Sequence, residues 1–407
     1  MPFANFLTII DFDSKFLFGG IGANITVLIT FILITMSIFR HYYIGLPAIV
    51  LIFIVLIYFY KGLGGGLELI AKSGQIPLFT LCYFQIGYVY VKSKFDFIGL
   101  VKLLKISLLS AAILGIIHYY FFYDITFIDI KYAMSADNES ILFIENYELN
   151  RFRETSIYFG ANSFAYMLCI GISLSGFVRA IKKISNLNYL LSLFILLWAL
   201  YITNSRSGLI IGSIIIIIYS YPYFKQKINI NKYFIIGMLT VIAVLINLIL
   251  NNRFSLYEII SDPRMAKNIL GLQLFYGNQS NWLIGSKIDA MMSDDNGVSV
   301  SDNMYINVLH SSGAIGIMLY IIFFKKVLNI KKKHLNTDSV VTNEILTLLY
   351  VVISLFLLSG LFSNSNGFIF LFSWVSMLCG SVISVINNNI SIDNNIDLEG
   401  IRIDLKY

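Results

Sequence analysis

Charged residues are scarce in this chain of 407 residues, and their scarcity excludes an ordinary soluble protein. Asp, Glu, Lys and Arg make up 13% of the sequence, whereas a soluble domain carries about one quarter. Hydrophobic residues make up 57%, and the mean hydropathy is +0.78. We therefore expect lipid, rather than water, to be the main solvent of this protein.

Cysteine is also rare, and the three cysteines lie within apolar runs: Cys82, Cys169 and Cys379. Each is expected to be a small core hydrophobe, and a disulfide framework is not indicated. The chain lacks a Gly-rich phosphate loop followed by Lys, the Cys and His spacing of a zinc site, and a serine nucleophile elbow. Chemistry on ATP or a nucleotide sugar at the inner face therefore has no motif to support it. We expect no cofactor and no metal.

Long apolar runs are abundant, and each is about 17 to 22 residues long, which is enough for a helix to cross roughly 30 Å of hydrocarbon. Lipid offers no partner for backbone N–H and C=O groups, so these runs must be helices. The predicted fold class is an all-α integral membrane protein, a polytopic bundle of about eleven transmembrane helices. The predicted spans are 21–39, 44–60, 74–91, 106–123, 157–178, 187–203, 208–224, 233–250, 304–324, 345–362 and 367–386.

Basic residues gather in short loops beside the helix ends, around Lys92, Arg179, Lys225 and Lys331. Such loops are typically cytoplasmic. This places the C-terminus inside. With eleven spans the N-terminus is outside, and the alternative is a further helix near Phe3 to Phe12 that reverses that end. The distribution also explains the net charge of +6 without a nucleic-acid partner. We expect one membrane domain over residues 1–386, followed by a polar cytoplasmic tail over 387–407.

Two predicted outer loops, 124–156 and 251–303, are too long to be simple turns, and loops of this length usually carry function. A transporter would place its ionisable residues near the bilayer midplane. In this sequence they crowd the outer rim instead, which favours an enzyme, with a transporter as the alternative.

Arginines at the outer loops and helix ends are candidates for a phosphate site, because a guanidinium forks onto phosphate oxygens. They are Arg151, Arg153, Arg206, Arg253 and Arg264. Arg253 lies just past a span, and for it an anchor at the membrane interface is the favoured alternative. Arg206 lies in a polar stretch, residues 203–207, that separates two spans with almost no loop. This stretch, which includes Ser205, either binds a lipid head group or caps the helix hairpin.

Polar residues also enter two of the predicted spans from the outer side. Asn162 lies one to two turns into the fifth span, where it either faces a cavity or bonds to a neighbouring helix. In the ninth span, Asn303, Asn307 and His310 share one helical face, with Asp302 just above them. This stripe is expected to line a cavity in which His310 or Asp302 acts as a base. The alternative is a histidine satisfied by a neighbouring helix.

Two glycines, Gly313 and Gly316, follow this stripe and are expected to permit close helix packing.

Four segments together resemble the O-antigen polymerase and O-antigen ligase superfamily of bacterial envelope glycosyltransferases. The resemblance covers most of the chain, from the first long loop to the eleventh span. The segments are R-x6-G-x-N from Arg153 to Asn162; TNSRSGLIIG over 203–212; RMAKNILGLQLF followed by WLIGS, from Arg264 to Ser286; and SDNMYINVLHSSGAIGIMLY over 301–320.

The resemblance implies a metal-independent transfer at the outer face of the bacterial inner membrane, from an undecaprenyl diphosphate-linked glycan to an acceptor hydroxyl. Arg206 and Arg264 would stabilise the departing diphosphate, and Arg153 would hold a lipid substrate. In the ligase branch a His opens the final segment, where this chain has Asp302 and Asn303. This difference favours a polymerase of O-antigen or capsule repeat units over a ligase.

The resemblance also implies a chain-length regulator and a flippase as partners. The expected catalytic residues are Arg206, Arg264, Asp302 and His310. The residues expected to bind substrate are Arg151, Arg153, Asn162, Ser205, Asn303 and Asn307.

Overall fold

The computed structural model describes residues 45–62, 66–121, 161–181, 183–227, 273, 282–285, 303–334, 340–360 and 371–388. Within these ranges the regular secondary structure is entirely helical. The helices are α3 (Leu46–Gly62), α4 (Gly66–Tyr90), α5 (Lys94–Phe121), α8 (Ala161–Ala180), α9 (Asn186–Ile202), α10 (Arg206–Lys227), α15 (Met304–His334), α16 (Val340–Ser359) and an unlabelled helix, Leu371–Asn388, which we call the 371–388 helix.

Among the described residues, five stretches are long and apolar enough to cross a membrane: Lys94–Phe121, Asn162–Ala180, Ser312–Asn329, Val341–Ser359 and Leu371–Asn388. The prediction of a helical membrane protein is therefore confirmed. Each predicted span has a helix in the structure except 21–39 and 233–250, which lie outside the described residues. Most of the two long loops also lies outside them, so the full count of eleven spans stays a prediction.

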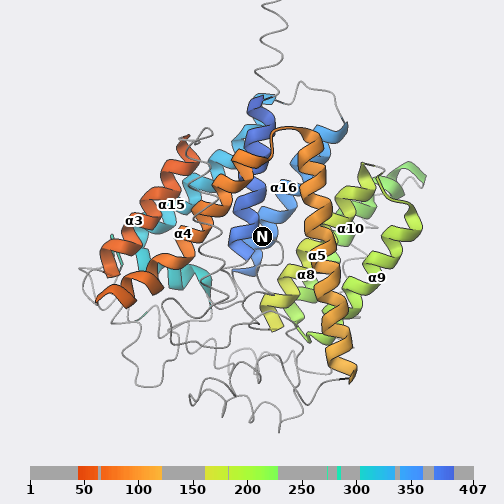
Figure 1. Ribbon diagram of the computed structural model, residues 1–407, viewed down its shortest axis with the longest axis horizontal. Coiled ribbons are helices and arrows are strands. Elements are labelled where there is room, and N and C mark those ends of the chain that lie inside the picture. Colours follow the sequence, from red (N-terminus) through yellow and green to blue (C-terminus); the bar gives the residue numbers. More distant parts are fainter. Residues whose placement is uncertain are drawn as a thin grey trace, which may run out of the picture.

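Two of the spans form the centre of the bundle (Figure 1). In both the Asn162–Ala180 span of α8 and the 371–388 helix, 89% of the apolar window is buried inside the protein. α8 is surrounded by α5, α9, α10 and α16, and α3 packs against α4 and α15. In contrast, only 33% of the Ser312–Asn329 window of α15 is buried, so this span forms an edge of the described bundle.

The 371–388 helix crosses α4 at very short range, because each helix presents a glycine to the other. A Cβ on Gly87 would overlap the carbonyl oxygen of Met377, and a Cβ on Gly380 would overlap that of Phe84. Such backbone contact replaces side-chain interdigitation and is typical of helix packing in lipid. At one end of this pair, Asn388 Nδ2 donates to the Lys92 carbonyl at 3.0 Å.

α5 begins at Lys94, twelve residues before the predicted start of its span at 106, and this corrects the prediction. The reason is a capping box. The backbone N–H of Asp96 donates to Ser93 Oγ at 3.1 Å, and Asp96 Oδ2 accepts from the Ser93 N–H at 3.0 Å. Hydropathy alone misses these first turns because they carry charged residues.

Basic residues from separate connections lie at one end of the bundle, which we call the Lys92 end; the α4–α5 connection lies at the top of Figure 1. Arg179, near the end of α8, places its guanidinium 4.6 Å from the centre of the Tyr189 ring. Lys92 lies 4.9 Å from the Tyr88 ring, and partial burial lowers the pKa of its amine. The opposite end, which holds the α9–α10 turn, we call the Ser205 end.

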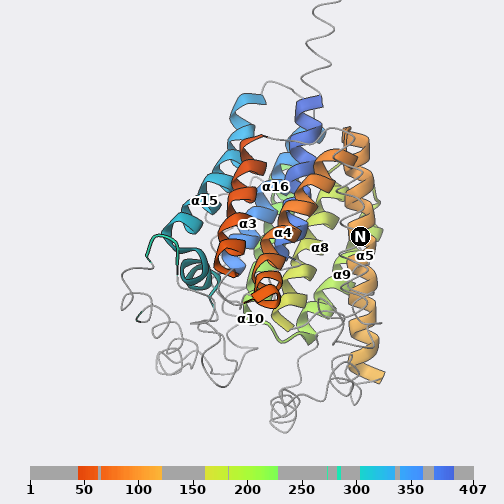
Figure 2. The same cartoon turned by 60° about the vertical axis from the view of Figure 1, so that its left-hand side comes forward.

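The predicted continuous span over 304–324 is wrong, because α15 is broken at Gly313. That residue has φ 65° and ψ −164°, which no helix accommodates. In Figure 2 the first turns of α15 are seen nearly end-on beside the lower end of α3, and the rest of α15 then rises at an angle to them. The break separates a short segment, residues 304–312, from the membrane-crossing part.

Candidate functional site

A turn of three residues joins α9 to α10 at the Ser205 end. α9 ends at Ile202, and Thr203 and Asn204 close the helix by donating their N–H groups to Ala199 at 3.3 Å and to Tyr201 at 3.0 Å. Asn204 has φ 50°, in the left-handed region that asparagine tolerates better than most residues. The chain can therefore reverse and begin α10 at Arg206 with almost no loop.

Ser205 is the N-cap of α10. Its Oγ accepts from the Gly208 N–H at 3.3 Å, and its carbonyl accepts the first bond of the helix, from Leu209, at 3.0 Å. Its own N–H donates to Thr203 Oγ1 at 3.2 Å. The structure thus shows hairpin capping, one of the two interpretations of this stretch, and shows that Ser205 and Thr203 perform it.

The same serine joins α10 to α8. Ser205 Oγ donates to Asn162 Oδ1 at 2.9 Å, and one turn further along α8 the Tyr166 hydroxyl lies 2.8 Å from Ser207 Oγ. The two serine hydroxyls lie 3.4 Å apart. We call Asn162, Tyr166, Ser205 and Ser207 the polar cluster. Of the two alternatives for Asn162, the structure shows the hydrogen bond to a neighbouring helix.

Close packing below the polar cluster fixes its geometry. Gly208 lies so near α8 that a Cβ on it would be 2.7 Å from Ala165 Cβ. Cys169 Sγ donates to the Gly208 carbonyl at 3.3 Å. All three residues are buried, so the start of α10 is held firmly against α8.

The electrostatics of this corner favour an anion. α8 and α10 run in the same direction, so their positive N-terminal ends meet at the polar cluster, and Arg206 is the first residue of α10. A cation at that position opposes the helix dipole and weakens the helix, but it strengthens the attraction for a negative group. The Arg206 side chain lies outside the described residues.

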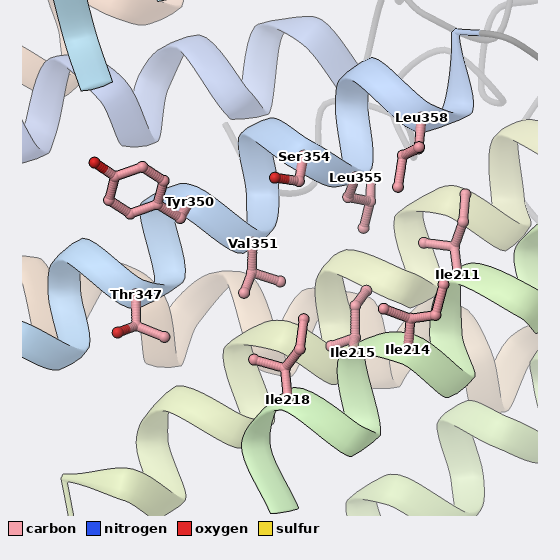
Figure 3. A pocket seen from close by; sticks show the side chains of 10 residues that line it. All are labelled: Ile211, Ile214, Ile215, Ile218, Thr347, Tyr350, Val351, Ser354, Leu355 and Leu358. Atoms are coloured by element: carbon pink, nitrogen blue, oxygen red, sulfur yellow. The ribbon is translucent and has the colours of Figure 1, made fainter. Parts of the chain in front are cut away.

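An apolar groove lies between α10 and α16 (Figure 3). Its volume is about 310 Å³. Ser207 and Ile211 are four residues apart on α10, so the polar cluster and the groove share one face of that helix. The lining residues are Ile211, Ile214, Ile215, Ile218, Thr347, Tyr350, Val351, Ser354, Leu355 and Leu358.

A second group of predicted residues lies on the first segment of α15. Asn303 Oδ1 accepts from the N–H of Tyr305 at 2.8 Å and of Ile306 at 3.4 Å, so Asn303 is the N-cap of this helix. Asn307 and His310 follow on the same segment. Their side chains lie outside the described residues, so the predicted polar stripe stays a prediction.

α16 connects the two groups of residues. It packs against α8 and α10. At its C-terminal end the Gly360 carbonyl accepts from the Met304 N–H at 2.9 Å, and the Leu357 carbonyl accepts from the Tyr305 hydroxyl at 2.6 Å. The polar cluster and the start of α15 therefore lie at the same end of the bundle.

Four predicted site residues lie outside the described part of the chain: Arg151, Arg153, Arg264 and Asp302. Conversely, sequence reasoning missed Tyr166. The sequence does indicate Tyr166, because it lies four residues after Asn162 and so shares the same face of the helix. The groove had no comparable signal, since its two walls come from helices more than 100 residues apart.

A comparison with known protein families and with curated proteins finds no match for this chain.

Proposed function

We propose that this protein is a membrane glycosyltransferase that polymerises the repeat units of a cell-surface polysaccharide, an O-antigen or a capsule. It moves an undecaprenyl diphosphate-linked glycan onto a lipid-linked repeat unit. The reaction takes place at the outer face of the bacterial cytoplasmic membrane, where the Ser205 end lies. The four sequence segments that resemble the O-antigen polymerase and ligase superfamily suggest this activity.

The observation that carries the proposal is the apolar groove that begins beside an electropositive polar corner. A lipid-linked diphosphate has the same two parts, a long apolar chain and an anionic head. Seven residues separate Ile211 from Ile218, so this wall of the groove extends about 10 Å along α10. The chain would lie against these isoleucines, and the diphosphate would lie beside Arg206 and the N-terminal ends of α8 and α10.

The proposed transfer needs one base and a stabilised leaving group. The acceptor hydroxyl oxygen attacks the anomeric carbon of the donor sugar and loses its proton to His310 or Asp302. The bond from that carbon to the diphosphate oxygen breaks, and undecaprenyl diphosphate leaves with the electron pair. Arg206 and Arg264 stabilise its growing negative charge.

The proposed orientation rests on the distribution of charge. Lys92, Lys94 and Arg179 lie at the end of the bundle opposite the polar cluster. Short loops rich in Lys and Arg stay in the cytoplasm. The Ser205 end therefore faces outward, toward lipid-linked glycans on the outer leaflet, and the C-terminus lies inside.

A lipid-linked sugar transporter is the second candidate, because the break in α15 resembles the discontinuous helices of transporters. Transporters place such breaks near the bilayer midplane. In α15 the stretch that is long and apolar enough to cross a membrane, Ser312–Asn329, begins at the break at Gly313 instead of containing it in its middle. The break therefore lies at the membrane surface, and this position favours the polymerase.

Deletion of the gene tests the proposal by its effect on the glycan. Gels of surface and lipid-linked glycan should lose the long-chain ladder, while single repeat units remain attached to the surface. Full-length chains that accumulate on the lipid carrier would indicate a ligase, and an unchanged ladder would refute polymerisation. Complementation with Arg206→Ala should fail to restore the ladder although the protein is inserted and abundant.

A further inference from the structure

The break in α15 creates a helix N-terminus inside the element. After Gly313, the N–H groups at the start of the membrane-crossing part have no carbonyl of a preceding turn to bond to. A short turn of chain from elsewhere supplies two carbonyls. Ala314 donates to Trp282 at 2.9 Å, and Ile315 donates to Leu283 at 3.1 Å.

The turn is Trp282–Gly285, in the second half of the long segment between α10 and α15. It binds α15 through these two backbone hydrogen bonds, while Trp282, Leu283 and Ile284 are 40%, 66% and 44% exposed. Gly285, in contrast, is buried and has φ 82°. The docking therefore depends on backbone geometry at a few positions.

Gly313 is the residue of α15 against which the backbone of the turn packs. A Cβ there would overlap the Leu283 carbonyl oxygen and would lie 2.5 Å from the Gly285 nitrogen. Its φ of 65° is also strained for any residue with a side chain. Any larger residue at 313 must expel the turn, straighten α15, or do both. The expectation that Gly313 serves helix packing is thus replaced by docking of a loop.

The segment before the break is fixed at its other end as well. Met304 donates to the Gly360 carbonyl and Tyr305 to the Leu357 carbonyl, so the start of residues 304–312 is tied to α16. Nine helical residues extend about 13 Å. We call residues 304–312 the strut. The strut lies at the Ser205 end, and α16 holds its first residues while the docked turn binds the residues that follow it.

We propose that the Trp282–Gly285 turn is a clamp that sets the position of the strut, and that Gly313 and Gly285 are positioning residues for the groups the strut carries. Those groups include His310 and Asn307. The clamp is a property of the fold, and its effect on catalysis rests on the proposed function. It also links the long outer segment to the reaction site, because release of the turn frees one end of the strut.

Cross-linking in native membranes tests the clamp without any assay of activity. We would introduce Leu283→Cys with Ile315→Cys and treat membranes with a short thiol cross-linker. These positions are joined by a backbone hydrogen bond, and both side chains are partly exposed. The natural cysteines are buried and free. The control pairs Leu283→Cys with Ile321→Cys, which is exposed on the same helix about 9 Å further along.

The clamp predicts a cross-link for the first pair and none for the control. Equal cross-linking of both pairs, or of neither, would overturn it. Adding Gly313→Ala should abolish the cross-link, and so should Gly285→Ala, which changes the turn and leaves the helix untouched. The matched control is Gly99→Ala, because a Cβ on Gly99 meets nothing within 4 Å. A cross-link that survives both changes at full yield would contradict the geometry.

Kinetics then separate positioning from folding. Gly313→Ala should lower kcat for chain extension by about 100-fold, since a shift of about 1 Å in a catalytic group can cost that much. The KM for the lipid-linked donor should change much less than kcat, because the residues that line the proposed lipid groove come from α10 and α16. Loss of the cross-link with unchanged kcat would refute the positioning role. If the wild-type protein shows no transferase activity, the proposed function fails and the cross-link alone decides the clamp.

Discussion

The Ser205 hydroxyl lies within hydrogen-bond distance of three groups, and two of these contacts hold α10 to its cap and to α8; replacing Ser205 by alanine removes both. One is the N-cap bond to the Gly208 N–H at 3.3 Å, and caps of this kind contribute about 1 kcal/mol. The other is the bond to Asn162 Oδ1 at 2.9 Å, and hydrogen bonds between membrane helices average about 0.6 kcal/mol. We therefore expect Ser205→Ala to lower the free energy of unfolding by about 1.5 kcal/mol.

Reversible unfolding in mixed micelles, titrated with a denaturing detergent, measures this difference. The matched control is Ser213→Ala on the same helix, whose hydroxyl bonds to the carbonyl of Leu209, one turn earlier, at 2.8 Å and to no other group in the described part of the chain. This control should cost less than about 0.5 kcal/mol, since such a bond competes with the helix and does not cap it. Equal destabilisation by the two variants would refute the capping argument.

A double-mutant cycle isolates the bond between helices. Ser205→Ala and Asn162→Ala should cost less together than the sum of the two single changes, with a coupling of at least about 0.5 kcal/mol. Strict additivity would show that the contact between Ser205 and Asn162 contributes nothing to the packing of α10 on α8.

Three further predictions concern helix packing, the anion site and the groove. Gly380→Ala should destabilise the protein strongly in the same titration, because its Cβ would overlap the Phe84 carbonyl, whereas Gly99→Ala should be neutral; equal effects would contradict the close crossing. Arg206→Lys should keep less than about a tenth of the chain extension measured on glycan gels, because an ammonium group cannot form the paired hydrogen bonds that a guanidinium makes to a diphosphate. Full activity would refute bidentate recognition. Ile218→Trp should raise the KM for the lipid-linked donor, because the larger side chain would obstruct the groove. Ile210 is equally exposed but does not line the groove, so Ile210→Trp should leave this KM unchanged. Equal KM values for the two variants would exclude the groove as the lipid site.

Much of the helical framework could be predicted from the sequence, because a helix in lipid must satisfy its own backbone and so leaves a run of apolar residues. The ends of the helices were less predictable. α5 starts early because of the Ser93 and Asp96 capping box, which hydropathy does not register. The break at Gly313 was missed for a different reason. It depends on a backbone angle and on carbonyls some thirty residues upstream, and no local pattern reports either.

The candidate site was predictable in part. The polar character of residues 203–207 between two spans predicts either a head-group site or a helix cap. The structure shows the cap, and the head-group site stays a prediction. The role of Asn303 in substrate binding stays a prediction, and the structure adds that its side-chain oxygen caps α15, which the sequence analysis did not anticipate. The link between Tyr166 and Ser207, and the groove below it, arise from the packing of separate helices, which a single sequence does not specify.

Reconstitution tests the central claim most directly. The purified protein would be placed in liposomes containing undecaprenyl diphosphate-linked single repeat units and no other protein, metal or nucleotide. We expect a ladder of longer lipid-linked chains, with one undecaprenyl diphosphate released for each unit added, and no ladder with Arg206→Ala. Single repeat units that stay single, or that only change leaflet, would contradict the proposal that this protein is a polymerase.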